Sequence, residues 1–442
     1  MVNKCRCVFT LSLLFSCIPQ AIAQSAPNAQ QRVEAQLQDE PFYQQVLKAP
    51  ALIPGNMTQT SVNCSLTPND DIHPQYKSAK QSQSDKAGWE QRISANWDYF
   101  EDVEQDSKIL MIDSRHQGDD MAYRYLANDN SHKLLYEPWS TSKVMAITAA
   151  ISKARAQGVG ARSLAGGKVP VADLITSIHT YQPFGGADGN SNAIATYLVN
   201  AAGRDYISGL FQGNWLRIAN PSVGLRGGYY VEIFNPGAPF WLDKQNNRQA
   251  AMPVLIANDA DPGYRSYRCQ ECGLTGNKPM TTLAQAEWLK RLAVHERDES
   301  TRHPNLTSDD IQTLFYGDGH SDSRHQHGGM IMGISRLLPH ALSQALGGNN
   351  DNAKTTLDNL TDGQWRIFQK IGWGPSETRG KSEVAVLAHV CLPGVQGGRE
   401  FTLAAHTAVN GDAEVRVSDA AKKMQRLLNQ SINKLLKETK SK

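Results

Sequence analysis

Residues 136–145 carry more information about fold and chemistry than any other part of the chain. They read Tyr136-Glu137-Pro138-Trp139-Ser140-Thr141-Ser142-Lys143-Val144-Met145. Because residues three apart lie on the same face of a helix, the Lys143 ammonium is expected beside the Ser140 hydroxyl. A free hydroxyl is a weak nucleophile, and a neighbouring amine that takes or relays its proton activates it. The stretch predicts a serine nucleophile at the start of a helix, where the helix dipole favours negative charge.

The surroundings of Ser140 distinguish it from a chance match. Two candidate strands, 108–113 and 121–126, precede it and are joined by a polar turn through Gly118 and Asp119. A helix rich in alanine and isoleucine follows over 144–156, and Pro138 suits its start. The same serine–lysine spacing recurs near the C-terminus, at Ser431 and Lys434. We interpret that copy as the polar face of an amphipathic helix.

The N-terminus has the pattern of a secretory signal. Lys4 and Arg6 precede a mostly apolar run over 8–18, and small residues lead to a cleavage site after Ala23. The apolar run is too short to span a membrane. We therefore predict a signal peptide over 1–23 and a periplasmic or secreted protein without a membrane span. A lipoprotein cleavage site before Cys17 is the weaker alternative.

Charge and cysteine content limit the possible partners. The formal net charge is +2, and removal of the leader brings it near zero; no basic block stands out. Nucleic acid is therefore not an expected partner. Four cysteines remain after the leader, namely Cys64, Cys269, Cys272 and Cys391. In an oxidising compartment they permit either a local Cys269–Cys272 disulfide or two long-range bridges, and the sequence leaves the pairing open.

The order of expected elements predicts the fold class. We expect an N-terminal extension over 24–87 and a main domain over 88–442, with an insertion at about 317–363. Helices are expected over 89–103, 144–156, 281–294, 308–316 and 418–437, and late strands over 365–372, 383–391 and 400–409. Strands thus open and close the domain around a helical middle. This predicts an α/β (α+β) fold with an antiparallel sheet built from N- and C-terminal strands.

Three motif positions give the chain its family resemblance. Ser140-Thr141-Ser142-Lys143 matches the S-x-x-K motif, Asn190-Ser191-Asn192 is similar to S-D-N, and Lys370-Ile371-Gly372-Trp373 is similar to K-T-G on a strand. With the element order, residues 88–437 resemble the class A β-lactamases and the related serine penicillin-binding proteins. The resemblance implies a β-lactamase/transpeptidase-like fold. It also implies an oxyanion hole formed by the backbone N–H groups of Ser140 and Trp373.

Two of the three motifs depart from the family pattern. In the family, the first serine of S-D-N relays a proton to the leaving nitrogen, but Asn190 stands there and an amide cannot relay a proton as a hydroxyl does. Ser191 would relay this proton only if the turn were rebuilt locally. Otherwise Asn190, Ser191 and Asn192 simply cap the start of a helix. In the third motif, Ile371 replaces a threonine whose hydroxyl helps to hold a substrate carboxylate. Lys370 keeps its positive charge, and Gly372 allows close approach of substrate. His327-Gly328-Gly329 is the less favoured alternative for this motif.

Hydrolysis of an acyl-enzyme also needs a carboxylate that activates water. The resemblance places it on a loop before Thr281-Thr282-Leu283, where Glu271 is the acidic residue close upstream and hence the candidate base. The alternative is a solvated glutamate beside two cysteines. A cluster without a family counterpart lies within 317–329: Asp318, His320, Asp322, His325 and His327. We interpret it as a polar, disordered loop, and we expect no metal and no cofactor.

The sequence therefore predicts an exported, monomeric serine hydrolase. It would act on a β-lactam or a peptide-like amide or ester, including peptidoglycan-derived substrates, through an acyl-enzyme on Ser140. Lys143 would assist, Asn190, Ser191 and Glu271 would be further catalytic candidates, and Asn192, Lys370, Gly372 and Trp373 would bind substrate. The alternative is a non-catalytic or retuned protein on the same fold that binds cell-wall fragments or β-lactams, with Tyr229, Tyr230, Trp241 and Trp373 lining a groove.

Overall fold

A seven-stranded sheet forms the centre of the computed structural model, which describes residues 42–67, 74–118, 120–229, 232–252, 278–348 and 352–438. The strand order is β1-β4-β3-β11-β10-β9, and β2 pairs in parallel with β4. The strands are β1 (Lys77–Ser78), β2 (Ala95–Asn96), β3 (Ser107–Gln117), β4 (Asp120–Ala127), β9 (Arg366–Ser376), β10 (Lys381–Leu392) and β11 (Arg399–Asn410). Antiparallel pairing of β3 with β11 joins strands from the two halves of the chain. The predicted fold class is confirmed.

Alternation along the strands divides the core into two layers. On β3, Ile109 and Met111 belong to the cluster around the C-terminal helix, whereas Leu110 and Ile112 belong to the cluster on the opposite face. This follows from the period of two in a strand, which sends successive side chains to opposite faces. Both faces are apolar because helices cover both.

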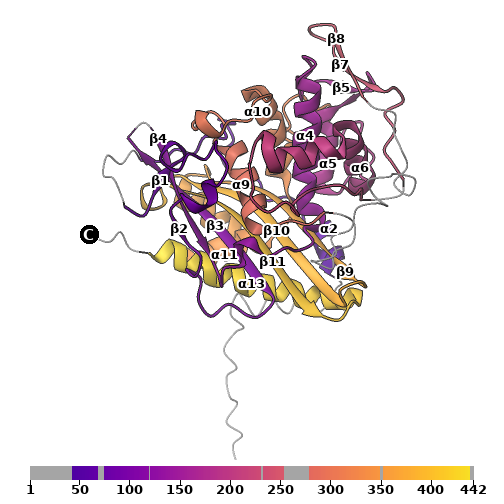
Figure 1. Ribbon diagram of the computed structural model, residues 1–442. Coiled ribbons are helices and arrows are strands. Elements are labelled where there is room, and N and C mark those ends of the chain that lie inside the picture. The colour runs from indigo at the N-terminus through magenta and orange to yellow at the C-terminus, as the bar shows by residue number, and fades with distance from the viewer. Residues whose placement is uncertain are drawn as a thin grey trace, which may run out of the picture.

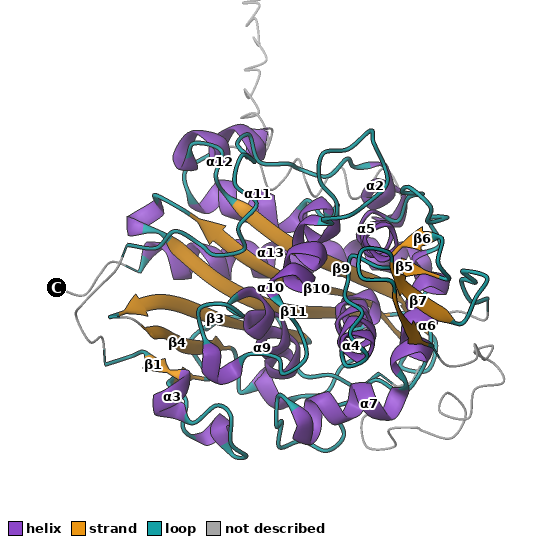
Figure 2. Cartoon of the chain, turned by 90° about the horizontal axis from the view of Figure 1, so that it is seen from above, coloured by secondary structure: helices purple, strands orange, loops and turns teal. Residues whose placement is uncertain are grey.

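The helices form one layer on each side of the sheet (Figure 1). One face is covered by α2 (Phe42–Lys48), α11 (Leu337–Ala345), α12 (Ala353–Thr361) and α13 (Glu414–Lys437). The other side carries α4 (Lys143–Arg155), α5 (Val171–Thr180), α6 (Ser191–Ala202), α7 (Arg204–Gly209), α9 (Thr282–Ala293) and α10 (Ser308–Tyr316). Figure 2 looks down on α4, α9 and α10 with the strands behind them.

Smaller elements complete the chain. The helix α3 (Ala79–Ser82) follows β1. A four-stranded sheet of β5 (Leu164–Ala165), β6 (Val169–Pro170), β7 (Phe240–Asp243) and β8 (Arg248–Ala251) lies at the far end of the helical layer (Figure 1). Within the described residues, no helix combines the length and apolarity needed to cross a membrane.

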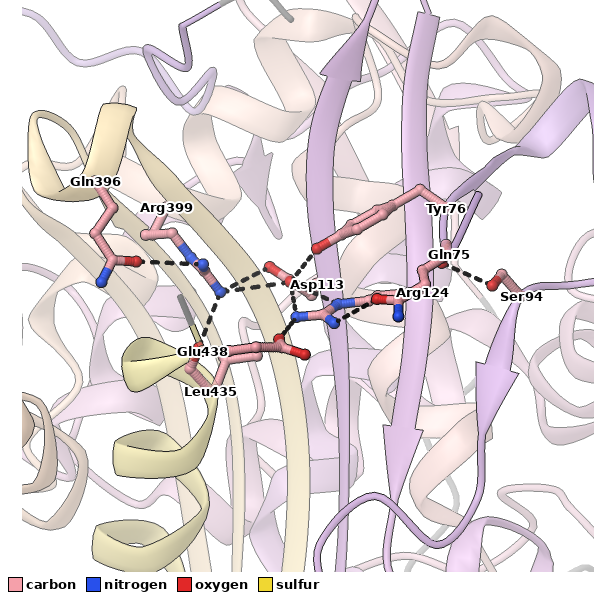
Figure 3. A network of polar contacts seen from close by, with 9 residues as sticks. All are labelled: Gln75, Tyr76, Ser94, Asp113, Arg124, Gln396, Arg399, Leu435 and Glu438. Atoms are coloured by element: carbon pink, nitrogen blue, oxygen red, sulfur yellow. Dashed lines mark hydrogen bonds and ion pairs between the residues drawn. The ribbon is translucent and has the colours of Figure 1, made fainter. Parts of the chain in front are cut away.

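A buried ionic network fastens the end of α13 to the sheet (Figure 3). Asp113 on β3, which is 1% exposed, accepts hydrogen bonds from Tyr76 Oη at 2.5 Å and from Arg124 Nε at 2.9 Å. Arg399 Nη2 lies 3.4 Å from the same carboxylate. Arg124 also pairs with Glu438, just beyond the last turn of α13. Several donors share one buried carboxylate, so its loss would remove the carboxylate partner of Arg399 and leave Arg124 with Glu438 alone.

A disulfide ties the N-terminal segment to the main sheet. Cys64 bonds to Cys391 on β10, across a sequence separation of 327 residues. The bridge is thus one of the long-range pairings that the sequence left open. Cys269 and Cys272 lie outside the described residues, as does the predicted signal peptide.

Two expectations about local structure need correction. The helix expected over 89–103 is wrong: Trp89–Gln91 is a single 3₁₀ turn, and Ala95–Asn96 pairs with β4 instead. The loop over 317–329 is not disordered, because His320 and His325 pack against the Phe184 ring at centroid distances of 5.2 and 5.3 Å.

The segment over 317–363, which the sequence suggested as an insertion, includes α11, whose apolar side chains are buried against α13. The domain bounds stay a prediction.

Candidate active site

A strained turn presents Ser140 at the start of α4. Residues Trp139–Ser142 form a 3₁₀ turn that runs directly into the helix, and Trp139 has φ of 50°, in the left-handed region. Such a conformation costs a non-glycine residue on the order of 1–3 kcal/mol and persists only where the surroundings enforce it. Trp139 Nε1 donates to Glu383 Oε2 at 2.8 Å, which holds the ring under β10. Burial opposes ionisation of Glu383, but His406 and Arg379 hold its pKa at about 2, so the acceptor stays charged.

Strand β9 passes so close to this turn that two of its positions require glycine. A Cβ on Gly372 would lie 2.5 Å from Ser140 N and 2.8 Å from Trp139 Cβ. A Cβ on Gly374 would lie 2.3 Å from the Trp139 ring. Gly372 and Gly374, which alternate along β9, therefore both face the Trp139–Ser142 turn, called the nucleophile turn below. The predicted third motif requires this arrangement. The glycine at 372 permits contact between the strand backbone and the Ser140 backbone.

Lys143 lies buried between the nucleophile turn and the start of α6. Its Nζ donates to Ser191 Oγ at 3.0 Å and to Asn192 Oδ1 at 2.6 Å. Burial, and secondarily the positive charge of Lys278, lowers the pKa of Lys143 well below its ordinary value. The second motif therefore meets the first through Ser191 and Asn192. Asn190 is instead the helix cap, because its Oδ1 accepts a hydrogen bond from Ala193 N at 3.0 Å.

Lys370 is the second buried lysine of the site. It is 1% exposed, and its Nζ lies 3.4 Å from Ile371 O and 3.7 Å from the centroid of the Tyr181 ring. Burial, and next the charge of Lys143, lowers the pKa of Lys370 well below the usual lysine value. The two lysines are thus electrostatic neighbours in a region shielded from water, where the charge of Lys143 disfavours the charged form of Lys370.

Tyr181 lies among Ser140, Lys143 and Lys370, and the sequence analysis did not identify it. It follows α5 directly, with φ of 57° at the helix C-cap. Its Oη donates to Ile371 O at 2.9 Å, and its side chain lines the same hollow as Ser140. Lys143 Nζ lies 5.6 Å from its ring centroid, on the side chain that Lys370 also contacts. Burial raises the pKa of Tyr181, although an interaction with Ser140 opposes the shift.

Two hollows open beside Ser140. Ser140, Asn192 and Trp373 belong to the walls of both. The first has a volume of about 540 Å³ and is completed by Leu47, Tyr181 and Glu414. The second has a volume of about 480 Å³, and its wall includes Glu137, Tyr229, Lys278 and Arg379. Both volumes are in the range of small-molecule sites. Ser140 therefore lies where two halves of a ligand could meet.

The second hollow contains a buried ion pair that the sequence did not indicate. Glu137 is 5% exposed and its Oε1 lies 3.8 Å from Lys278 Nζ. Burial raises the pKa of Glu137 and lowers that of Lys278, while each charge opposes the shift of the other. Lys278 Nζ also donates to Gly228 O at 3.1 Å and lies 5.1 Å from the Tyr229 ring centroid. The pair gives this hollow a polar wall.

The remaining sequence candidates divide between the site and other places. Trp373 lies edge-to-face with Phe42 and tilted against Tyr181, at centroid distances of 5.8 and 5.3 Å, and lines both hollows. Trp241 is buried, and its Nε1 donates to Tyr197 Oη at 2.6 Å. Glu271 and Tyr230 lie outside the described residues, so the water-activating carboxylate stays a prediction. Within the described part of the chain, no group of three or more His, Cys, Asp or Glu side chains is arranged to hold a metal ion.

Comparison with known proteins gives only remote likenesses. No protein-family model and no curated protein matches the chain. Among solved structures, the chain is similar to an extended-spectrum β-lactamase, TLA-1, with 11% identity and a TM-score of 0.40 over 77% of this chain and 96% of that one. A β-lactamase from Xanthomonas campestris has 14% identity and a TM-score of 0.38, over 74% and 90%. The C-terminal domain of the Bacillus licheniformis BlaR penicillin receptor has 12% identity and a TM-score of 0.34, over 76% of this chain and 96% of that one.

These are proteins of the kind that the three motifs resemble. At such identities and TM-scores they carry no argument about chemistry, which rests on the site itself.

Proposed function

We infer that the chain is a serine hydrolase of the β-lactamase and penicillin-binding class, which acts through an acyl-enzyme on Ser140. One observation carries the inference. A serine on a strained turn opens onto two hollows, while two lysines with lowered pKa values lie buried around it. Perturbed titratable groups that converge on a pocket are the usual mark of a reacting site.

The proposed reaction begins with attack of Ser140 Oγ on a carbonyl carbon. Burial raises the neutral fraction of Lys143 at moderate pH, and a neutral amine can take or relay the serine proton. Asn192 and Ser191 orient the Lys143 amine through their hydrogen bonds. The oxyanion would be stabilised by the backbone N–H groups of Ser140 and Trp373, and the close approach at Gly372 supports this geometry.

The positions of the cations suggest how substrate charge would be met. Lys370 is almost fully buried, so we assign it an electrostatic role behind Tyr181 rather than direct contact with a substrate carboxylate. Lys278 and Arg379 line the second hollow, where a negatively charged group of the substrate would meet them. The substrate class is a β-lactam or a peptide-like amide or ester, including peptidoglycan-derived fragments. Such a substrate fits the export that residues 1–23 predict.

The test is an intact-mass time course of the mature protein with benzylpenicillin, with Ser140→Ala in parallel. We expect an adduct on the wild type that Ser140→Ala lacks. Decay of the adduct within seconds to minutes indicates turnover, and its persistence indicates a penicillin-binding role. Glu271→Gln tests the predicted base, since it should prolong the adduct without slowing its formation. Undiminished turnover by Ser140→Ala would overturn the assignment.

A further inference from the structure

The second motif of this chain lacks the hydroxyl that its resemblance leads one to expect. Asn190 has no hydroxyl, and its side-chain oxygen caps α6. Ser191 has one, but that oxygen is buried, accepts from Lys143 at 3.0 Å and donates to Ile178 O at 3.2 Å. Ser191 also lines neither of the two hollows, unlike Tyr181, so its hydroxyl does not face a bound substrate. The site needs another group if a proton is to reach the leaving atom of the substrate.

Tyr181 meets the requirements of position. Its hydroxyl donates to Ile371 O on β9 at 2.9 Å, and its oxygen keeps lone pairs that can accept a proton. Tyr181 and Ser140 line the same hollow of about 540 Å³. Its ring lies against the Nζ atoms of Lys370 and Lys143, at 3.7 and 5.6 Å from the centroid. Among the described residues around Ser140, Tyr181 therefore combines a hydroxyl, a place in the wall of the same hollow and two neighbouring lysine amines.

We propose that Tyr181 is a catalytic residue that relays the proton between Ser140 and the leaving nitrogen of the substrate. This assignment rests on the function proposed above. As Ser140 Oγ bonds to the carbonyl carbon and the carbon–nitrogen bond breaks, the Ser140 proton passes to Tyr181 Oη. The proton that Tyr181 held passes to the departing nitrogen. Tyr181 begins and ends as a neutral phenol, so the step is balanced without an added reagent.

The electrostatic surroundings suit this exchange. Burial keeps the phenol protonated at rest, because it raises the pKa of Tyr181. Partial negative charge on the oxygen during the exchange would be met by the N–H dipoles of the two lysine amines beside the ring. Lys143 and Lys370 thus assist the exchange through Tyr181. Lys370 thus has a role in the proposed step, although it is not among the described residues that line either hollow.

The relay is tested with Tyr181→Phe, which keeps the ring and removes only the hydroxyl. Acylation of Ser140 is followed by intact mass with benzylpenicillin, whose leaving atom is an amide nitrogen, and with p-nitrophenyl acetate, whose leaving group departs without a proton. General acid–base catalysis contributes about 10²–10⁴-fold, so we expect penicillin acylation to slow by about 10²-fold or more. The ester should slow at least about tenfold less, because it needs no protonation.

The control is Tyr206→Phe. It removes a part-buried hydroxyl that lies 2.6 Å from Ser152 Oγ, away from the hollows. It should acylate as the wild type does. Equal slowing of both substrates by Tyr181→Phe would indicate a structural role and overturn the relay, as would an unchanged rate. A wild type that neither probe acylates would overturn the function proposed above and the relay with it. A wild type acylated on Ser140 while Tyr181→Phe matches it would overturn the relay alone.

Discussion

Gly372 offers the sharpest test of the contact between β9 and the nucleophile turn. In Gly372→Ala, the new Cβ would lie 2.5 Å from Ser140 N, 2.8 Å from Trp139 Cβ and 3.1 Å from Thr141 N. Ordinary contacts begin near 3.4 Å, so the strand and the turn must separate by roughly 0.9 Å. Two of the opposing atoms are backbone, so rotation of a side chain cannot relieve the overlap. Gly372 does not have a positive φ, so the substitution tests space alone.

The expected cost is larger for chemistry than for stability. Overpacking costs about 1–3 kcal/mol of unfolding free energy. A displacement of about 1 Å at a reacting site costs about 10²-fold in rate. We therefore expect Gly372→Ala to fold, to lose about 1–3 kcal/mol in urea denaturation, and to acylate Ser140 about 10²-fold more slowly.

Gly213→Ala is the matched control, because a Cβ at Gly213 meets nothing within 4 Å and that residue also has no positive φ. It should leave both the acylation rate and the stability near those of the wild type. If Gly372→Ala acylates within about threefold of the wild type, the reasoning on close approach is refuted.

Three further predictions concern stability and pH. Asp113→Ala should lower the free energy of unfolding by about 3–5 kcal/mol, because it takes the shared buried carboxylate from Arg399 and Arg124 and leaves Arg124 only Glu438; a loss below about 1 kcal/mol in urea denaturation would contradict this. Reduction of the Cys64–Cys391 bridge should cost roughly 3–5 kcal/mol, since it releases a long closed loop, and coincident unfolding curves with and without reductant would refute it. The acylation rate should rise with pH as Lys143 loses its proton and should level off well below the ordinary lysine range. A rate that is still rising at pH 10 would argue against a neutral Lys143.

The sequence predicted the elements whose periodic pattern is strong. The helix expected over 308–316 has those bounds in the structure, and the strands expected over 383–391 and 400–409 lie within β10 and β11. The pattern over 308–316 reflects one buried face of a helix. The patterns over 383–391 and 400–409 reflect strands that are covered by helices on both faces. The helix expected over 89–103 failed because Ala95–Asn96 pairs with β4, while Trp89 and Phe100 are buried in clusters on opposite faces of the sheet, which the local spacing cannot reveal.

The candidate site was predictable where neighbours in sequence are neighbours in space. Ser140 and Lys143 belong to one short stretch, and Asn192 reaches Lys143 because it starts a helix that packs on α4. Tyr181 was not predictable in this way. Irregular chain separates it from Asn190, so it is absent from any contiguous motif. Only the tertiary fold brings its hydroxyl to Ile371 O on β9 and its side chain into the same hollow as Ser140. The weak signal was a tyrosine at the end of a helix immediately before a glycine-rich loop.

The charge arrangement itself favours a reacting site over a passive binding site. Lys143 and Lys370 are both buried, and the charge of Lys143 further lowers the pKa of Lys370. Burial has the opposite effect on Tyr181 and raises its pKa. The same apolar surroundings thus leave a phenol that keeps its proton next to amines that readily lose theirs, with Ser140 in contact with the phenol. Environments that push the pKa values of neighbouring groups apart define an acid and a base. Simple binding gains nothing from buried lysines, whose desolvation is costly, whereas acyl transfer needs both groups at one nucleophile.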